Sequence, residues 1–438
     1  MNVHSNMIKV STVELQIAER ARNFRGESLH NLHHYIDFPM LVESYKYLNK
    51  QSAKGVDGLT WQDYGEGLNE RLETLLQEFK SGRYRAPAIR RVYIPKDKHS
   101  QRPLGIPTIE DKVLQSSVRK VIEPIYEEEF KEFSYGFRPG RSQHQAIDLM
   151  FRKVSFEKMH YIIDADIKNY FGSINHVFLR EFLDKRVNDG VVRRMIDKWL
   201  KAGIMESGNI SYPDEGTPQG GIISPILSNI YLHYVLDEWF SGQIQPLLKG
   251  RSFIIRYADD FIMGFSEKSD AQRVMEVLPK RFAKYDLTLH PEKTKLIDLN
   301  NLRGQSDRSF DFLGFTHYLG KSRKGMKVLK RKTSSKKFTK AVTNIDEYIK
   351  VNRHMKLKYL IAMLNLKLRG HYLYYGIIHN YKGIHRYYDE VRRKLYKWLS
   401  RRGGKTKWNW NSVVKLTEEW QPLIKPLISK PYVQTLRN

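Results

Sequence analysis

The sequence predicts an α+β protein in which short apolar strands are followed by a helical and strongly basic carboxyl-terminal region. Three observations support this class. Short runs of β-branched and aromatic residues are bounded by turn residues, as in 253–265, which is typical of hairpins. Longer segments repeat apolar residues at helical spacing, as in 68–79. Hydrophobic residues make up 41% of the 438 residues, which is enough for a globular core.

The amino-terminal part has helical patterns over 13–21 and 40–48, and two short strands are expected within 89–107. A polar loop joins these strands. Lys96 and Arg102 flank the loop and form a plausible clamp for a polyphosphate. Basic hairpin loops without such a role are also common, so this signal is weak alone.

A helix is expected over 111–128, and a loop over 134–141 follows it. Gly and Pro in this loop are expected to expose Arg138 and Arg141. Both cations are therefore candidates for contact with nucleic acid.

An apolar strand near residue 165 carries carboxylates on one face. Asp164 and Asp166 are two residues apart, while Ile163, Ala165 and Ile167 share the opposite face. An unpaired carboxylate in such a strand is expensive to bury. This favours a metal-binding or catalytic role over a structural ion pair.

A Gly- and Pro-rich turn precedes an apolar helix after residue 215. Gly220 and Gly221 allow the backbone to approach a ligand closely, and Gln219 is the polar group placed there. The turn lacks the Gly-Lys-Ser/Thr of a nucleotide-binding P-loop, which excludes that class.

The predicted hairpin 253–265 places Asp259 and Asp260 at its tip, inside an otherwise apolar run. Two adjacent like charges cost free energy unless a cation compensates them. An acidic turn without a metal is the alternative, because Asp is common in turns.

The charge of the chain is concentrated after residue 320. Residues 321–438 contain 30 Lys and Arg against 6 Asp and Glu, a net charge of +24, whereas residues 1–320 contain 45 against 42, or +3. Helices are expected over 336–351, 356–369 and 387–401. The asymmetry favours a nucleic-acid-binding module; an anionic membrane is the weaker alternative, because no long one-sided amphipathic helix is evident.

Aromatic and cationic residues alternate in a predicted loop over 368–376 and again at 384–388. This composition suits a nucleic-acid backbone with stacked bases, although a Tyr-rich core explains some of these rings equally well. The candidates for contact in this region are Lys330, Arg331, Lys336, Arg369, Tyr372 and Arg386.

Several protein classes are excluded by composition. The chain has no cysteine, which rules out disulfides and cysteine-ligated zinc modules. Its first residues lack the apolar core of a signal peptide, and no run approaches the roughly 18 apolar residues of a membrane span. We therefore expect a cytoplasmic protein without a membrane partner.

The carboxylates and the glycine-rich turn together indicate nucleotidyl transfer on a polynucleotide. Carboxylates from neighbouring strands can hold two Mg²⁺ ions about 4 Å apart. One ion would activate a primer 3′-hydroxyl, and the other would neutralise the triphosphate and the leaving pyrophosphate. Mn²⁺ is a possible substitute.

Four motifs resemble one enzyme family. Tyr257-Ala-Asp-Asp260 resembles the catalytic motif of reverse transcriptases. Gly216-Thr-Pro-Gln-Gly-Gly221, Tyr135-Gly-Phe-Arg-Pro-Gly-Arg141 and Phe312-Leu-Gly-Phe315 extend the likeness in family order. With them the chain resembles the bacterial group II intron-encoded reverse transcriptase/maturase family from about residue 35 to residue 430.

The resemblance implies a right-hand polymerase whose fingers and palm contain antiparallel sheet and whose α-helical thumb doubles as the maturase domain. The implied divisions are an amino-terminal extension, fingers and palm, a thumb and a basic tail, at 1–60, 61–320, 321–402 and 403–438.

The resemblance also implies roles for individual residues. Asp166, Asp259 and Asp260 match the catalytic carboxylates, with Asp166 and Asp259 the main metal ligands and the backbone carbonyl of Ile167 completing the site. Asp164 is implied to support them. The residues implied to contact the dNTP are Lys96, Arg102, Phe171, Gln219 and Lys293.

Three of these matches carry a more specific implication. Phe171 matches the residue that excludes a 2′-hydroxyl, Lys293 matches a possible general acid near the pyrophosphate, and Gly314 lies in the turn that resembles the primer grip.

The implied function is an RNA-directed DNA polymerase that extends a DNA primer on an RNA template with dNTPs. It would also bind group II intron RNA as a maturase in splicing and retromobility. Two alternatives stay open: a splicing factor whose polymerase site is dispensable, and a domesticated relative in phage defence or DNA repair. Since only about 35 residues follow Gly403 and cysteine is absent, we expect no endonuclease domain and a primer supplied from elsewhere.

Overall fold

The computed structural model describes residues 12–95, 101–206, 208–212, 215–217, 220–300, 308–403 and 408–428. The chain divides into two compact units. The first unit comprises Met1–Ala146 and Ile163–Leu296, and the second comprises Ile147–Ile162 and Ile297–Asn438.

The first unit contains a four-stranded sheet with the order β2-β1-β4-β5. Its strands are β1 (Ile89–Pro95), β2 (Gln101–Ile106), β4 (Ile204–Glu206) and β5 (Asn209–Ser211). β1 and β2 form the predicted antiparallel hairpin, in which Ile94 lies opposite Arg102. The short strands β4 and β5 were not predicted, and β4 runs parallel to β1.

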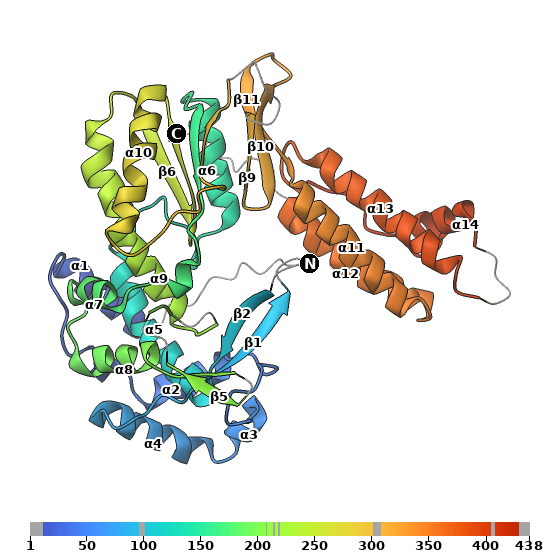
Figure 1. The fold of residues 1–438 in the computed structure, drawn as a ribbon. Coiled ribbons are helices and arrows are strands. Elements are labelled where there is room, and N and C mark those ends of the chain that lie inside the picture. The colour runs from blue at the N-terminus through green and yellow to red at the C-terminus, as the bar shows by residue number, and fades with distance from the viewer. Residues whose placement is uncertain are drawn as a thin grey trace. The chain divides into compact units, whose positions relative to one another are not determined.

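Helices lie beside and below this sheet in the lower part of Figure 1. They are α1 (Thr12–Asn23), α2 (Phe38–Tyr47), α3 (Trp61–Gly65), α4 (Leu68–Ser81), α5 (Ile109–Glu127), α7 (His176–Asp184) and α8 (Gly190–Leu200). α5 is the central helix, since most of its residues are buried and both α1 and α2 pack against it. The described part of the expected amino-terminal extension therefore belongs to the same compact unit as the helices that follow it.

A second sheet has the order β6-β7-β3-β8. Its strands are β6 (Ser252–Tyr257), β7 (Asp260–Phe265), β3 (Tyr161–Ala165) and β8 (Lys295–Asp298). The β6–β7 hairpin confirms the prediction for 253–265, and its register pairs Tyr257 with Asp260. α10 (Lys268–Ala283) packs against β7, and α9 (Ser224–Leu232) continues into the π-helical segments His233–Asp237 and Phe240–Ile244.

The second unit begins with α6, which spans Gln143–Ser155 and enters the unit at Ile147. An antiparallel sheet of order β11-β10-β9 follows, built from β9 (Ser309–Phe312), β10 (Phe315–Lys321) and β11 (Lys327–Thr333). Its helices are α11 (Ser335–Asn352), α12 (Leu357–Tyr375), α13 (Tyr381–Leu399) and α14 (Trp410–Lys415).

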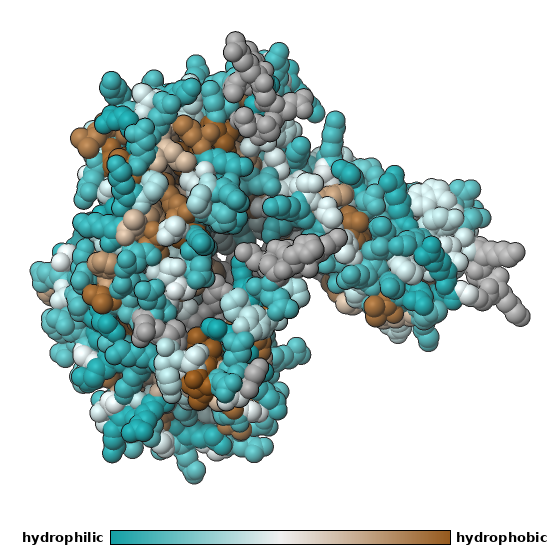
Figure 2. Space-filling view, viewed as in Figure 1, coloured by the Kyte–Doolittle hydropathy of each residue, from teal (hydrophilic) through white to brown (hydrophobic). Residues whose placement is uncertain are grey.

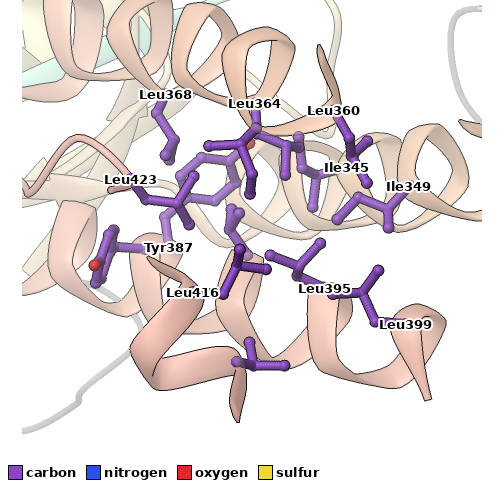
Figure 3. Close-up of a cluster of buried hydrophobic side chains, with 14 of the residues drawn as sticks. Ile345, Ile349, Leu360, Leu364, Leu368, Tyr387, Leu395, Leu399, Leu416 and Leu423 are labelled. Atoms are coloured by element: carbon purple, nitrogen blue, oxygen red, sulfur yellow. The ribbon is translucent and has the colours of Figure 1, made fainter. Parts of the chain in front are cut away.

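The helices of the second unit share one apolar core. Figure 3 shows Ile345, Leu364, Leu395 and Leu416 pointing toward one another from four helical segments. Each is almost fully buried, and burying one such side chain stabilises the fold by about 1.5–3 kcal/mol. The apolar residues that recur along each helix face this core, which explains why the sequence pattern predicts the three long helices.

One expectation for these helices is wrong. α12 continues to Tyr375, so the residues 368–376 are helical up to their end rather than a loop. Leu368 and Tyr372 are buried in the core, and a side chain at Gly370 would meet no atom within 4 Å. Tertiary packing on one face of the helix therefore outweighs the weak helical propensity of an exposed glycine.

Hydrophilic side chains cover most of α11–α13 on the face drawn in Figure 2. Within the described ranges, no helix combines the length and the apolar character needed to cross a membrane.

Candidate active site

The tip of the β6–β7 hairpin holds Asp259 in a tight turn. Ala258, directly before it, has a left-handed backbone conformation with φ of 59°. A residue with a Cβ atom pays about 1–2 kcal/mol for that conformation, so the surroundings must stabilise the turn. Asp259 is half-buried, whereas Asp260 is exposed at the start of β7.

Residues 133–136 support this turn from one side. The N–H of Tyr135 donates to the carbonyl of Arg256 at 2.8 Å, and the N–H of Arg256 donates to the carbonyl of Phe133 at 2.9 Å. A Cβ atom on Gly136 would lie 2.2 Å from the backbone nitrogen of Ala258. Gly136 is therefore required by backbone-to-backbone packing beneath the turn.

A buried arginine supports the same turn from within. The Arg256 side chain is fully buried and donates to both carboxylate oxygens of Asp237, at 2.8 and 2.5 Å. It also donates to Asn229 Oδ1 at 2.8 Å and to the carbonyl of Ala258 at 3.2 Å. Asn229 in turn donates to the carbonyl of Gly136 at 2.7 Å.

These residues, which we call the turn clamp (Gly136, Asn229, Asp237 and Arg256), were missed in the sequence. Arg256 lies between Ile255 and Tyr257 in an apolar run, and the burial argument applied to Asp166 would have selected it too. Asp237 closes a π-helical segment, a distortion that is frequent at functional sites.

Asp166 follows β3 and is half-buried. Its carbonyl accepts from the N–H of His290 at 2.7 Å, and the N–H of Lys168 donates to Thr288 at 2.8 Å. These bonds bracket the antiparallel bridge between Ile167 and Leu289. In such a non-hydrogen-bonded pair, the Ile167 carbonyl points away from Leu289.

The two carboxylates interact electrostatically. Burial raises the pKa of Asp259, and the negative charge of Asp166 raises it further. The opposing influences on the Asp259 pKa are a hydrogen bond from its own backbone and the charges of Arg102 and Arg256. Lys293 extends its ammonium group to Asp166, with Nζ 2.5 Å from Oδ2.

Of the predicted site residues, Lys293 contacts Asp166, and the charges of Asp166 and Arg102 both act on Asp259. Asp260 directly follows Asp259, and Asp164 is half-buried in β3. Lys96 and Gln219 lie outside the described residues.

The glycine-rich turn packs on the segment that carries Phe171. The N–H of Thr217 donates to the Phe171 carbonyl at 2.7 Å, and His176 Nε2 donates to the Gly216 carbonyl at 2.7 Å. A Cβ atom on Gly220 would lie 2.3 Å from the carbonyl oxygen of Gly105 in β2. Gly220 therefore allows the turn to approach the backbone of β2 closely.

Three predicted nucleic-acid contacts are buried structural residues instead. Arg138, expected to be exposed, donates to Glu127 and to the carbonyls of Lys131 and Ser134. In the second unit, Arg331 pairs with Asp148 at 3.1 Å, and Tyr372 belongs to the helical core.

The remaining candidates keep an accessible position. Lys336, Arg369 and Arg386 are exposed, and Lys330 and Arg141 are half-buried. Gly314 lies between β9 and β10 with φ of 81°, as a tight turn requires.

The donors around Asp259 have the chemistry of a divalent-cation site. Asp166 and Asp259 supply carboxylate oxygens, which Mg²⁺ prefers, and their mutual repulsion is the cost that a cation relieves. The Lys293 ammonium already compensates Asp166 in part. Within the described ranges, no group of three acidic or histidine side chains is arranged to hold an ion.

Comparison with known proteins agrees with this geometry. Residues 94–317 match the family model described as reverse transcriptase (RNA-dependent DNA polymerase), and residues 336–414 match the group II intron maturase-specific domain. Protein YkfC of Escherichia coli is 33% identical over 62% of this chain and 77% of that protein.

Two further relatives are much longer than the regions that match. The group II intron-encoded protein LtrA of Lactococcus lactis is 41% identical over 43% of this chain, and the match spans 31% of LtrA. A putative COX1/OXI3 intron 2 protein of Saccharomyces cerevisiae is 24% identical over 83% of this chain and 47% of its own length. The α+β class, with antiparallel sheets followed by helices, is confirmed. The chain belongs to the group II intron-encoded reverse transcriptase/maturase family, and its catalytic domain is that of an RNA-directed DNA polymerase.

Proposed function

We propose that this protein extends a DNA primer on an RNA template by two-metal-ion nucleotidyl transfer. The 3′-oxygen of the primer attacks the α-phosphate of a dNTP, forms a new phosphodiester bond and displaces pyrophosphate. The observation that carries this proposal is the position of the half-buried Asp259 on a hairpin turn held by buried groups.

Asp166 and Asp259 would hold divalent ions, with Asp260 and the outward-pointing carbonyl of Ile167 as further donors. When bound, Mg²⁺ or Mn²⁺ supplies Lewis-acid activation of the attacking oxygen and neutralises developing charge. The role of the turn clamp is to fix the Asp259 carboxylate before substrate arrives, which reduces the reorganisation needed for catalysis.

The cationic groups near the carboxylates would bind and orient the dNTP. Arg102 is exposed on β2 within electrostatic reach of Asp259, as a triphosphate clamp requires, and Lys96 would complete the clamp. The Lys293 side chain is 54% exposed, so it is free to leave Asp166 and protonate the departing pyrophosphate. Phe171 would exclude rNTPs through its contact with the 2′-position, and Gln219 would lie beside the incoming nucleotide.

The second unit would bind structured intron RNA and serve as a maturase. Its exposed cations, Lys336, Arg369 and Arg386, support phosphate contacts. Gly314 would belong to the turn that holds the primer.

The test is primer extension on a poly(rA)/oligo(dT) substrate with Mg²⁺. Asp259→Asn should lower the rate by about 10³-fold or more, because groups that act as a unit fail together. The matched control is Asp57→Asn, which changes an exposed aspartate of the same unit and should leave the rate unchanged. An Asp259→Asn protein that folds and polymerises at the wild-type rate would overturn the proposal.

An RNA-binding splicing factor with a dispensable polymerase site is the second candidate, favoured by the maturase-domain match at 336–414. Whether or not the polymerase activity is dispensable, the Asp259→Asn protein should bind intron RNA at the wild-type level. Splicing that survives Asp259→Asn in cells, together with loss of retromobility, would separate the two activities. Flanking DNA without a catalytic intron would favour a domesticated role in defence or repair.

A further inference from the structure

A basic hollow lined by aromatic rings lies in the first unit and contains none of the site residues described above. It has a volume of about 610 Å³ and is formed by the ends of α7 and α10 and by residues 234–243. Its volume falls within the range of pockets that hold small ligands, about 300–1,000 Å³.

Aromatic rings supply the apolar walls. Tyr234 and Trp239 are largely buried, and Tyr285 is half-buried. Two cations lie over these rings: Lys185 Nζ is 4.1 Å from the centre of the Tyr234 ring, and the Arg281 guanidinium is 4.6 Å from that of Tyr285. Flat rings with cations beside them suit a nucleobase joined to a phosphate.

The charge of the lining is unbalanced. Four cationic residues line the hollow against one acid, Glu238. A hydrogen bond with His233 and the charges of Lys131 and Lys185 lower the pKa of Glu238, so this acid is already compensated.

Among the described residues, Arg281 is the cation of this hollow whose side chain is hydrogen-bonded. Arg281 donates to the carbonyls of Val235 and Tyr234, at 2.8 and 2.9 Å, and so completes the π-helical segment. Lys131, Lys185 and Lys284 form no ion pair within the part of the chain that the structure describes.

We propose that this hollow binds one nucleotide unit of a single-stranded RNA, as a site additional to the catalytic carboxylates and to the helical unit. The base would rest against the Tyr285 and Trp239 rings, beside the Arg281 guanidinium that lies over both. The neighbouring phosphates would be neutralised by Lys131, Lys185 and Lys284, which follow three different helices, α5, α7 and α10. Charges spread over three elements suit a strand that passes across the hollow better than a single compact triphosphate.

The hollow shares one structural element with the turn clamp. The π-helical segment His233–Asp237 presents Tyr234 to the hollow and Asp237 to Arg256. A test must therefore leave Tyr234, Asp237 and Arg281 intact, and the three lysines are suitable targets because their side chains make no hydrogen bond within the described ranges.

The experiment measures binding of a labelled 20-nucleotide single-stranded RNA to the full chain over a range of salt concentrations. The Lys131→Gln/Lys185→Gln/Lys284→Gln protein should bind about 10-fold more weakly, with a salt slope reduced by about 2, since each single-strand phosphate contact contributes about 0.7. The control protein, Lys80→Gln/Lys201→Gln/Lys268→Gln, loses the same charge from exposed positions of the first unit and should stay within about twofold of wild type.

Two outcomes would overturn the proposal. One is equal weakening in both triple variants, which would show only a general charge effect. The other is displacement of the labelled RNA by ATP that binds as tightly as the RNA does. That result would assign the hollow to a free nucleotide. The rate of primer extension by the test variant at saturating primer–template should stay within about twofold of the wild-type rate. If Asp259→Asn turned out not to affect polymerisation, the RNA-binding result for the hollow would still stand.

Discussion

The β6–β7 turn and the basic helices α11–α13 use charged residues in opposite ways. At the turn, Arg256 and Asp237 are fully buried and hydrogen-bonded, so their positions are fixed by the cost of leaving either one alone. On α11–α13, Lys336, Arg369 and Arg386 are exposed, so their contribution depends on the number of charges and on salt. The buried pair therefore acts through its fixed position, whereas the exposed cations act through their total charge.

Breaking the buried pair should give the largest effect. Arg256→Ala leaves Asp237 as an uncompensated buried charge and should destabilise the first unit by about 3–5 kcal/mol, measured by urea unfolding. A combined Arg256→Met/Asp237→Leu protein removes both charges and should regain much of that stability. It should nevertheless polymerise slowly, because the Ala258 carbonyl has lost its donor. Full activity in this double variant would show that the clamp does not position the turn.

A second buried acid predicts a pH dependence in the same unit. Burial raises the pKa of Asp111 to about 7, although hydrogen bonds from Trp199 and Tyr84 oppose this. The folded state therefore binds the proton more tightly than the unfolded state, and stability falls as the pH rises from about 4 to about 7. The maximum loss is about 4 kcal/mol.

Asp111→Asn replaces the ionisable carboxyl group with an amide that does not titrate, and so tests the prediction. The difference in unfolding free energy between wild type and Asp111→Asn should change between pH 4 and pH 7 and stay constant above pH 7. Glu123, whose pKa burial also raises, is common to both proteins and cancels in the difference, whereas the charge of the neighbouring Glu110 contributes to the raised pKa of Asp111 itself. A difference that does not vary with pH would contradict the assignment.

A Gly→Ala substitution, which adds one methyl group, should have opposite effects in the two units. Gly136→Ala places a carbon against the Ala258 backbone and should reduce the rate of DNA synthesis by about 10²-fold, because displaced catalytic groups lose orientation. Gly370→Ala, in an exposed position of α12, meets no atom and should stabilise the second unit by about 0.5–1 kcal/mol. Thermal unfolding and primer extension on both variants check this contrast.

Two arginines of the second unit should differ by a smaller amount. Arg386→Gln removes an exposed cation and should lower the salt slope of RNA binding by about 0.7–0.9 with stability unchanged. Arg331→Gln removes a buried cation that pairs with Asp148 and donates to the Ile147 carbonyl, so it should instead lower the melting temperature. Equal effects of the two substitutions on RNA binding would contradict the distinction between exposed and buried cations.

Local sequence pattern predicted most elements but not their tertiary partners. The hairpins at 89–107 and 253–265 and the three long helices have a clear apolar period, and the structure contains them. The strands β4 and β5 contain three residues each, which is too short to show such a period, and β5 is exposed throughout. For the site, an acid in an apolar strand identified Asp166, whereas the requirement for Gly136 arises only when residues 136 and 258 meet.

Sequence composition also does not show which arginines are buried. Arg138 and Arg331 have sequence surroundings that resemble those of exposed basic residues, but each lies beside a carboxylate supplied by a helix elsewhere in its unit. Composition counts such residues as surface charge, and only the packed fold shows that they are internal.

The separation of the turn clamp along the chain has a consequence for folding. Gly136, Asn229, Asp237 and Arg256 come from segments up to 120 residues apart, and they meet only when the first unit is assembled. Many active sites open locally at lower cost than the whole domain. Here the β6–β7 turn lacks its supporting contacts until the first unit is assembled. Polymerase activity should therefore appear and be lost in the same cooperative transition as the first unit itself.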